Sequence, residues 1–124
     1  MVPQGMVKQP SVKTQKLALT IAQLEGYNKK GTLAQRQNNP GNLRYVGQPG
    51  AVKGKGGFAV FSTPQAGFTA LHNQIMLDAS RGLSLQQFVY KYAPPSSNNT
   101  ASYLNYISKT LQAKPQLRLG DVLR

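Results

Sequence analysis

The stretch LALTIAQLEGYN at residues 17–28 decides how this chain begins to fold, because it joins a helical apolar stripe to a stop signal. Three apolar residues stand at positions i, i+4 and i+7 and so share one helical face: Leu17, Ile21 and Leu24. Gly26 suits the end of that helix, because glycine readily takes the left-handed conformation found there. The pattern predicts a helix from residue 12 or 13 to Glu25.

Glu25 is the only glutamate in the chain, and the other carboxylates are Asp78 and Asp121. At about 100° per residue, the Glu25 side chain lies about 40° from that of Ile21, at the edge of the apolar stripe. A carboxyl group in that position is partly removed from water, which raises its pKa. Glu25 is therefore a candidate proton donor near neutral pH. The simpler alternative is a solvated glutamate at a helix end.

The region after this helix has the composition of a loop. Residues 26–57 hold eight of the twelve glycines and few large apolar side chains. This composition predicts a small irregular lobe, with short strands at 43–45 and 58–61. The Asn-Pro-Gly-Asn sequence at 39–42 predicts a turn inside the lobe.

Three more helices are predicted where Ser, Thr or Asn residues stand at capping positions. They cover Pro64 to about 80 after Ser62 or Thr63, 84 to about 92 with Ser84 and Gln87 as a capping box, and about 100–112 after Asn98 or Asn99. The expected fold is a mainly α (α+β) domain over residues 13–124, with a small β lobe after the first helix. Residues 1–12 are expected to form a flexible tail.

The composition argues against several kinds of site. The 124 residues contain no cysteine, one histidine and three carboxylates, so we expect no disulfide, no metal site and no cofactor. No apolar run approaches the roughly 18 residues of a membrane span. The N-terminal residues lack the apolar segment of a secretory signal. We expect a monomer made of one domain.

The formal net charge of +12 predicts a polyanionic partner or milieu. Nucleic acid and an anionic bacterial envelope both fit, because the basic residues are scattered from Lys8 to Arg124. Aromatic residues interleaved in a basic stripe are typical of nucleic-acid binding, whereas the tyrosines here follow helical packing intervals. The arrangement of the tyrosines therefore argues against nucleic acid.

Four stretches, taken in order, resemble the lysozyme-like superfamily, and lytic transglycosylases and bacterial or phage N-acetylglucosaminidases within it. They are IAQLEGYN at 21–28, QNNPGNLRY at 37–45, GFAVFSTPQAGFTAL at 57–71 and YAPPSSNNTASYLNYI at 92–107. The second is similar to an Asn-rich segment of phage cell-wall enzymes. In the fourth, Asn99-Thr100-x-x-Tyr103 is similar to a Glu-Thr-x-x-Tyr stretch that places a tyrosine beside the catalytic acid. The chain departs from many transglycosylases in having Gly26 where they have serine.

The resemblance implies a lysozyme-like fold with Glu25 as the catalytic residue. The candidate substrate-binding residues are Asn38, Asn39, Asn42, Arg44, Tyr45 and Tyr103. Alternation along the predicted strand sends one of Arg44 and Tyr45 to the cleft, and the resemblance nominates Tyr103. The three asparagines fit a purely structural role as turn formers equally well. His72 falls within the apolar stripe of its predicted helix, which favours a hydrogen-bonded core histidine over a catalytic one.

The small number of carboxylates limits which mechanism of glycosidic cleavage is possible. Hydrolysis by paired carboxylates needs a second Asp or Glu near the acid. No carboxylate occurs between Glu25 and Asp78, and Asp78 stands three residues before Arg81, so we interpret it as half of a surface ion pair. The alternative route uses the N-acetyl group of the sugar to stabilise the anomeric centre. Glu25 then serves as acid and afterwards as base on the sugar's 6-hydroxyl, which leaves a 1,6-anhydromuramoyl end.

We therefore expect a peptidoglycan lytic transglycosylase that cleaves the MurNAc–GlcNAc β-1,4 bond. The short chain fits a phage enzyme, either an endolysin or a virion component. Such an enzyme acts on the host cell wall or periplasm, from the virion or the host cytoplasm, and its partners are glycan strands, the anionic envelope and other virion proteins. One alternative is a hydrolytic muramidase or glucosaminidase on the same fold. Another is a non-catalytic basic protein of the virion, or one that binds nucleic acid.

Overall fold

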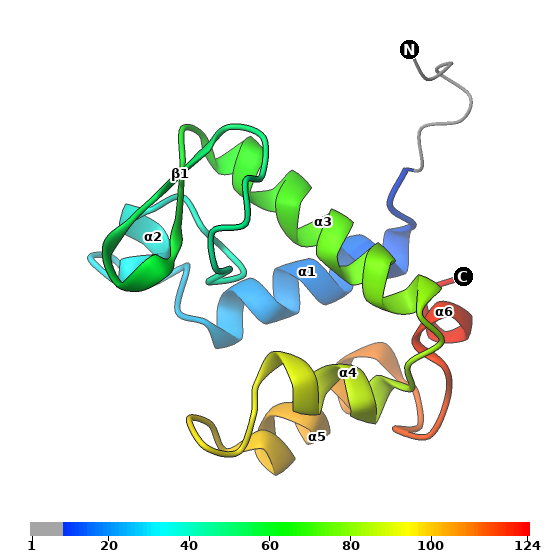
Figure 1. Ribbon diagram of the computed structural model, residues 1–124. Coiled ribbons are helices and arrows are strands. Elements are labelled where there is room, and N and C mark those ends of the chain that lie inside the picture. Colours follow the sequence, from blue (N-terminus) through cyan, green and yellow to red (C-terminus); the bar gives the residue numbers. More distant parts are fainter. Residues whose placement is uncertain (1–8) are drawn as a thin grey trace.

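A computed structural model describes residues 9–124 as a mostly helical protein with one small two-stranded sheet (Figure 1). Its elements are α1 (Val12–Leu24), α2 (Leu33–Arg36), β1 (Ala51–Lys53), the 3-10 turn η2 (Lys55–Gly57), β2 (Ala59–Phe61), α3 (Pro64–Ser80), α4 (Leu85–Tyr92), α5 (Thr100–Leu111) and α6 (Leu119–Val122). Most of the tail expected at 1–12 lies outside the described residues. Ser11 already caps α1, so the ordered chain begins before residue 12.

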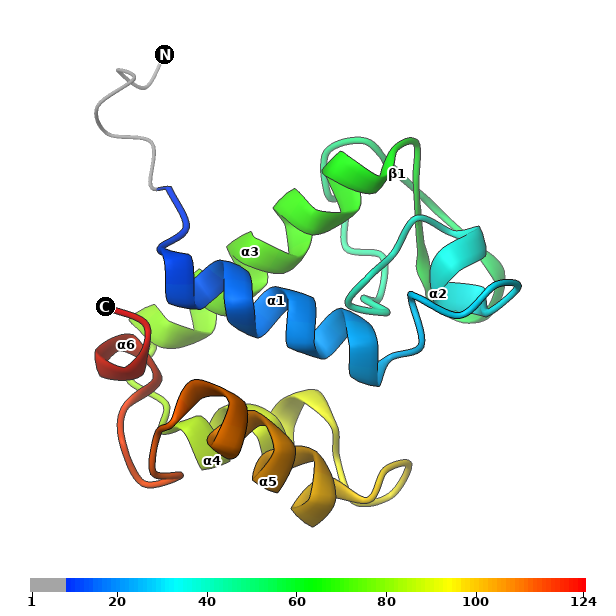
Figure 2. The same ribbon diagram turned by 180° about the vertical axis from the view of Figure 1, so that it is seen from behind.

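Helix α1 lies at the centre of the helical body. It packs against α3 on one side and α5 on the other, and Figures 1 and 2 show it between α3 and the α4–α5 pair in both views. The core consists of apolar side chains from all these helices, and its fully buried members include Leu17, Ile21, Leu71, Ile75 and Ile107. The stripe predicted for the first helix thus faces the core, with Leu24 packed at its margin.

The long helices begin at predicted caps. The Thr63 hydroxyl accepts the backbone N–H of Ala66, and Pro64 is the first residue of α3, where its missing N–H costs nothing. Ser84 and Gln87 form the reciprocal capping box of α4. The Asn99 side chain accepts from the third residue of α5. These three starts are confirmed because each depends on residues only two or three positions apart.

The lobe between α1 and α3 differs from its predicted form. Strand β2 was expected, but it pairs with β1 in antiparallel register, Ala51 opposite Phe61, and β1 was not predicted. The strand expected at 43–45 is reduced to a single bridge between Arg44 and Phe58. The short helices α2 and α6 were also not predicted. Elements of three or four residues carry too little periodic signal to be recognised in a sequence.

The lobe joins the body through β2, which contacts α3. Both views place β1 and α2 near the end of α1 that carries Glu25, whereas α6 lies near the opposite end of α1 (Figures 1 and 2). Across residues 9–124, no helix is both long enough and apolar enough to cross a membrane.

Candidate functional site

A cavity of about 520 Å³ lies between the lobe and the helical body, and it contains the candidate chemistry. Its walls come from the end of α1, the 41–44 loop, α3, α4 and the segment after α4. The ionisable residues that line it include Glu25, Arg44, Asp78 and Lys91. Two carboxylates and two cations therefore share one polar hollow.

Glu25 stands at the C-terminal cap of α1. Its backbone N–H donates to the carbonyl of Ile21 at 2.8 Å, and Gly26 follows with a φ of +80°, which turns the chain away from the helix. Its carboxylate accepts a hydrogen bond of 2.9 Å from the hydroxyl of Tyr103. Burial raises the pKa of Glu25, while the Tyr103 hydroxyl and the Asn42 amide act in the opposite direction. The expectation of a raised pKa, made from helical periodicity, is confirmed.

Tyr103 reaches Glu25 from α5, 78 residues further along the chain. Its side chain is buried, and burial, followed by the nearby Glu25 charge, raises the pKa of the Tyr103 hydroxyl. The hydroxyl therefore keeps its proton and remains a donor to the carboxylate. Tyr106, one turn further along α5, is exposed and its hydroxyl lies 3.2 Å from Oε1 of Gln23. The two tyrosines thus have different partners.

Asn42 is the asparagine of the lobe that faces the site. It adopts a left-handed backbone conformation, with φ of +50°, and lines the cavity. Its amide favours the ionised form of Glu25 and so acts to lower the pKa of that carboxyl. Its Oδ1 atom is buried and has no hydrogen-bond partner within residues 9–124.

Asn38 and Asn39 support the lobe instead. Asn39 is fully buried, and its amide nitrogen donates to the carbonyls of Leu43 at 2.9 Å and Ala59 at 3.0 Å. Its Oδ1 accepts from the Leu43 backbone at 2.8 Å, so the whole amide is used. The Asn38 amide donates to the Phe61 carbonyl at 3.0 Å. Neither Asn38 nor Asn39 lines the cavity, so their expected substrate contact is not supported by their positions.

Arg44 lines the cavity, whereas Tyr45 does not. The Arg44 guanidinium carbon lies 4.8 Å from the centroid of the Phe58 ring, and Nη1 donates to the Gly56 carbonyl at 2.8 Å. These two contacts fix the guanidinium at the wall of the cavity. Tyr45, the next residue, is exposed outside the cavity, so its expected substrate contact is not supported by its position.

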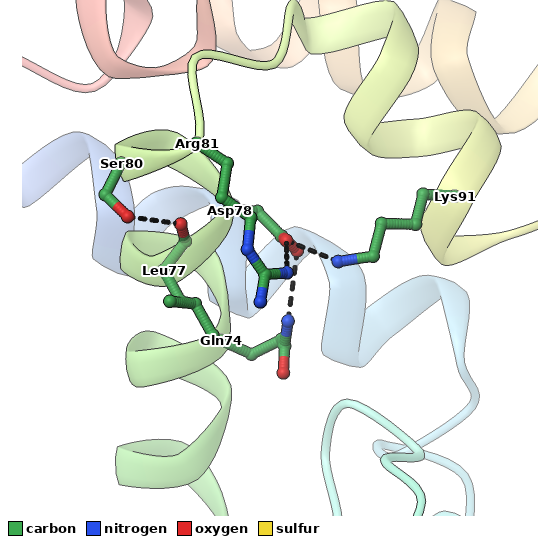
Figure 3. Close-up of polar contacts among 6 residues, drawn as sticks. All are labelled: Gln74, Leu77, Asp78, Ser80, Arg81 and Lys91. Atoms are coloured by element: carbon green, nitrogen blue, oxygen red, sulfur yellow. Dashed lines mark hydrogen bonds and ion pairs between the residues drawn. The ribbon is translucent and has the colours of Figure 1, made fainter.

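Asp78 is not the surface ion pair that its spacing from Arg81 indicated. The pair itself is present at 3.2 Å, but Asp78 is only 1% exposed. Figure 3 shows the Asp78 carboxylate accepting from Gln74 on α3, from Arg81 directly after α3, and from Lys91 on α4. Asp78 lies three residues after Ile75 and seven after Leu71, so the sequence did contain a signal that it faces inward.

Tyr92 is a residue of the site that the sequence did not indicate. It ends α4, lines the cavity, and donates its hydroxyl to the carbonyl of Gly41, which joins the helical body to the lobe. A Cβ at Gly41 would lie 2.5 Å from the Tyr92 oxygen, so this contact requires glycine. Burial first, and then the charges of Glu25 and Asp78, raise the pKa of Tyr92. No local pattern could pair two residues 51 positions apart.

His72 lies outside the cavity. It is half-buried, its ring centroid is 6.3 Å from that of Phe68, and burial lowers its pKa. The expected hydrogen-bonded core histidine is therefore not found: His72 is outside the core cluster and makes no hydrogen bond within residues 9–124. In that same part of the chain, no group of three or more His, Cys, Asp or Glu residues is placed to hold a metal ion.

Comparisons of this chain with protein-family models, with curated proteins and with solved structures found no match. The resemblance to lysozyme-like enzymes therefore rests on the sequence stretches quoted above, and the function has to be argued from the geometry of the cavity.

Proposed function

We propose that this protein cleaves the MurNAc–GlcNAc β-1,4 bond of peptidoglycan as a lytic transglycosylase, with Glu25 as its catalytic acid and base. The observation that carries the proposal is the setting of Glu25: a half-buried carboxyl group with a raised pKa, held by Tyr103, on the wall of a polar cavity. A carboxyl group whose pKa is raised holds its proton to a higher pH than an ordinary glutamate does, which suits it to protonate a leaving oxygen.

The proposed reaction has two proton transfers through one residue. Glu25 gives its proton to the glycosidic oxygen as that oxygen leaves the anomeric carbon, and the acetamido oxygen of the same sugar stabilises the charge there. The Glu25 carboxylate then takes the proton of the 6-hydroxyl, whose oxygen closes onto the anomeric carbon. The sugar becomes a 1,6-anhydro ring without water, and Glu25 regains its proton.

Neutral groups of the site fit this route. Asn42 supplies a neutral amide to the wall of the cavity, and this amide favours the ionised form of Glu25. The Tyr103 hydroxyl fixes the carboxylate and stabilises it in its ionised half-step. Preorganised dipoles of this kind can supply several kcal/mol to a transition state.

The position of Asp78 favours a second candidate, a hydrolytic muramidase or glucosaminidase on the same scaffold. Asp78 lines the cavity that holds Glu25, so two carboxylates are present where the sequence argument allowed one. Its oxygens already accept from Lys91, Arg81 and Gln74, however. A carboxylate engaged by three donors is a poor base or nucleophile, and this engagement supports the transglycosylase over the hydrolase.

We further propose that the protein has a lysozyme-like fold and acts on an anionic cell wall. The order of a helix ending in Glu25, a small polar lobe and then helices supports a lysozyme-like fold. The net charge of +12 supports action on an anionic cell wall, as a phage endolysin or virion component.

Digestion of purified sacculi, followed by mass analysis of the products, tests the proposal. We expect 1,6-anhydromuramoyl ends that borohydride cannot reduce, and no such products from Glu25→Gln. Reducible MurNAc or GlcNAc ends would support the hydrolytic candidate. No cleavage at all, together with tight and salt-dependent binding to DNA, would overturn both and favour a nucleic-acid-binding protein.

A further inference from the structure

Asp78 holds two cations that differ in one respect. Arg81 and Lys91 both contact its Oδ1 atom, and their side chains are similarly exposed, at 52% and 48%. Lys91 lines the cavity that holds Glu25, whereas Arg81 does not. The two cations therefore have the same partner and similar exposure, and they differ in whether they line the cavity.

The charges of Asp78, Arg81 and Lys91 do not cancel. One buried carboxylate faces two cations, which leaves a net charge of +1 before any ligand enters. Since Asp78 is shared with Arg81, the ammonium of Lys91 keeps part of its attraction for a further anion. Its half-exposed side chain leaves room for that anion to approach from the cavity.

The lobe contributes a second cation to the same cavity. The Arg44 guanidinium is anchored by the Phe58 ring and by the Gly56 carbonyl, which engages one of its nitrogens. Within the described residues, no acidic side chain forms an ion pair with Arg44. Both cations are thus held in place by protein contacts before a ligand binds, which reduces the entropic cost of using them.

We propose that Lys91, with Arg44 as the second cation, binds a carboxylate of the muramoyl substrate beside the bond that Glu25 cleaves. This inference rests on the proposed function. The ligand chemistry is a carboxylate on the glycan strand. It has two possible sources: the free lactyl group of a muramic residue without a peptide, or a carboxylate of the attached peptide. In either case the site would make the enzyme prefer muramoyl glycans to neutral ones.

The test measures binding to the catalytically inactive Glu25→Gln protein by calorimetry. Four tetrasaccharides are compared: muramoyl glycan with free lactyl carboxylates, the same glycan with lactyl amides, the same glycan carrying peptides, and the neutral N-acetylglucosamine tetramer. Lys91→Gln is compared with Arg81→Gln, which removes the matched cation of Asp78. Lys91→Arg serves as the charge-preserving rescue, and melting temperatures check that each variant is folded.

We expect Lys91→Gln to weaken binding of the carboxylate glycan by about 3- to 10-fold, the range of a partly exposed charged contact. Binding of the amidated and neutral glycans should change little, and Arg81→Gln should leave all four unchanged. A loss confined to the peptide-bearing glycan would assign the carboxylate to the peptide, whereas a loss with the peptide-free acid would assign it to the lactyl group.

Two outcomes would overturn the inference while leaving the proposed function intact. One is an equal effect of Lys91→Gln on charged and neutral glycans, and the other is an equal effect of Lys91→Gln and Arg81→Gln, since either would indicate a structural role only. Failure of wild-type protein to cleave sacculi, with no glycan bound by Glu25→Gln, would overturn the proposed function and this inference with it.

Discussion

Two carboxylic side chains line one cavity, and the groups around them are of opposite kinds. Glu25 is surrounded by neutral groups, namely the Tyr103 hydroxyl and the Asn42 amide, in a site where burial raises its pKa. Asp78 is more deeply buried but contacts two cations and an amide. Burial among neutral partners raises the pKa of a carboxyl group, whereas cationic partners around a buried carboxyl group offset the effect of burial and can link helices. The neighbours, and not the residue type, separate the two roles.

The largest expected effect concerns the Glu25 region. Glu25→Gln should lower the rate of sacculus cleavage by about 10²- to 10⁴-fold, because glutamine keeps the shape of the side chain but cannot transfer a proton. Its melting temperature should fall little, since the Tyr103 hydroxyl can still donate to the amide oxygen. Rates by dye release from labelled sacculi and melting by circular dichroism check both statements. A variant that keeps most of its activity would remove Glu25 from the reaction.

The next largest effect is expected from removing the Tyr103 hydroxyl, the neutral partner of Glu25. Tyr103→Phe removes the hydroxyl that donates to the carboxylate, and turnover should fall about 10- to 100-fold. Tyr106→Phe is the matched control, because its hydroxyl contacts Gln23 on the same helix pair. Removing the Tyr103 hydroxyl should also raise the pKa of Glu25 and move the alkaline limb of the pH–rate profile upward. Equal losses in the two variants would assign Tyr103 to packing alone.

The third prediction concerns Asp78 and the two cations that contact it. Asp78→Asn should reduce the free energy of unfolding by about 1–3 kcal/mol, because Lys91 and Arg81 lose their common partner. The cost is limited since both cations are half-exposed and can be hydrated. Turnover measured well below the melting temperature should change less than in Glu25→Gln. A loss of turnover as large as that of Glu25→Gln, in a folded variant, would break the comparison and revive the paired-carboxylate reaction.

The smallest effect is a dependence of stability on pH. The pKa of Glu25 is raised above its ordinary value of 4.5, so the unfolded chain releases this proton before the folded protein does. The contribution of Glu25 to stability is therefore greatest below that ordinary value and is lost as the pH rises through the folded pKa. Subtracting the melting curve of Glu25→Gln from that of wild type, at a series of pH values, isolates this contribution. A difference that grows in favour of wild type with rising pH would contradict it.

Much of the helical body could be predicted from the sequence. The spacing of Leu17 and Ile21, the Thr63 and Asn99 caps and the capping box of Ser84 each involve residues within a turn or two of one another. Helical geometry converts such spacings into shared faces and satisfied backbone groups without knowledge of the rest of the chain. The same local geometry placed Glu25 at the margin of the core and so anticipated the direction of its pKa shift.

The composition of the site was decided by the tertiary structure. Among three neighbouring asparagines, Asn38 and Asn39 donate to backbone carbonyls of the lobe, whereas Asn42 lines the cavity. Lys91 meets Asp78 across 13 residues of sequence, and Tyr92 meets Gly41 across 51. Such pairs form only when α4 packs beside α3 and the lobe. Local spacing fixes which face of a helix a side chain occupies, but the partner on that face, and with it the chemistry of the side chain, depends on which distant segment the core brings there.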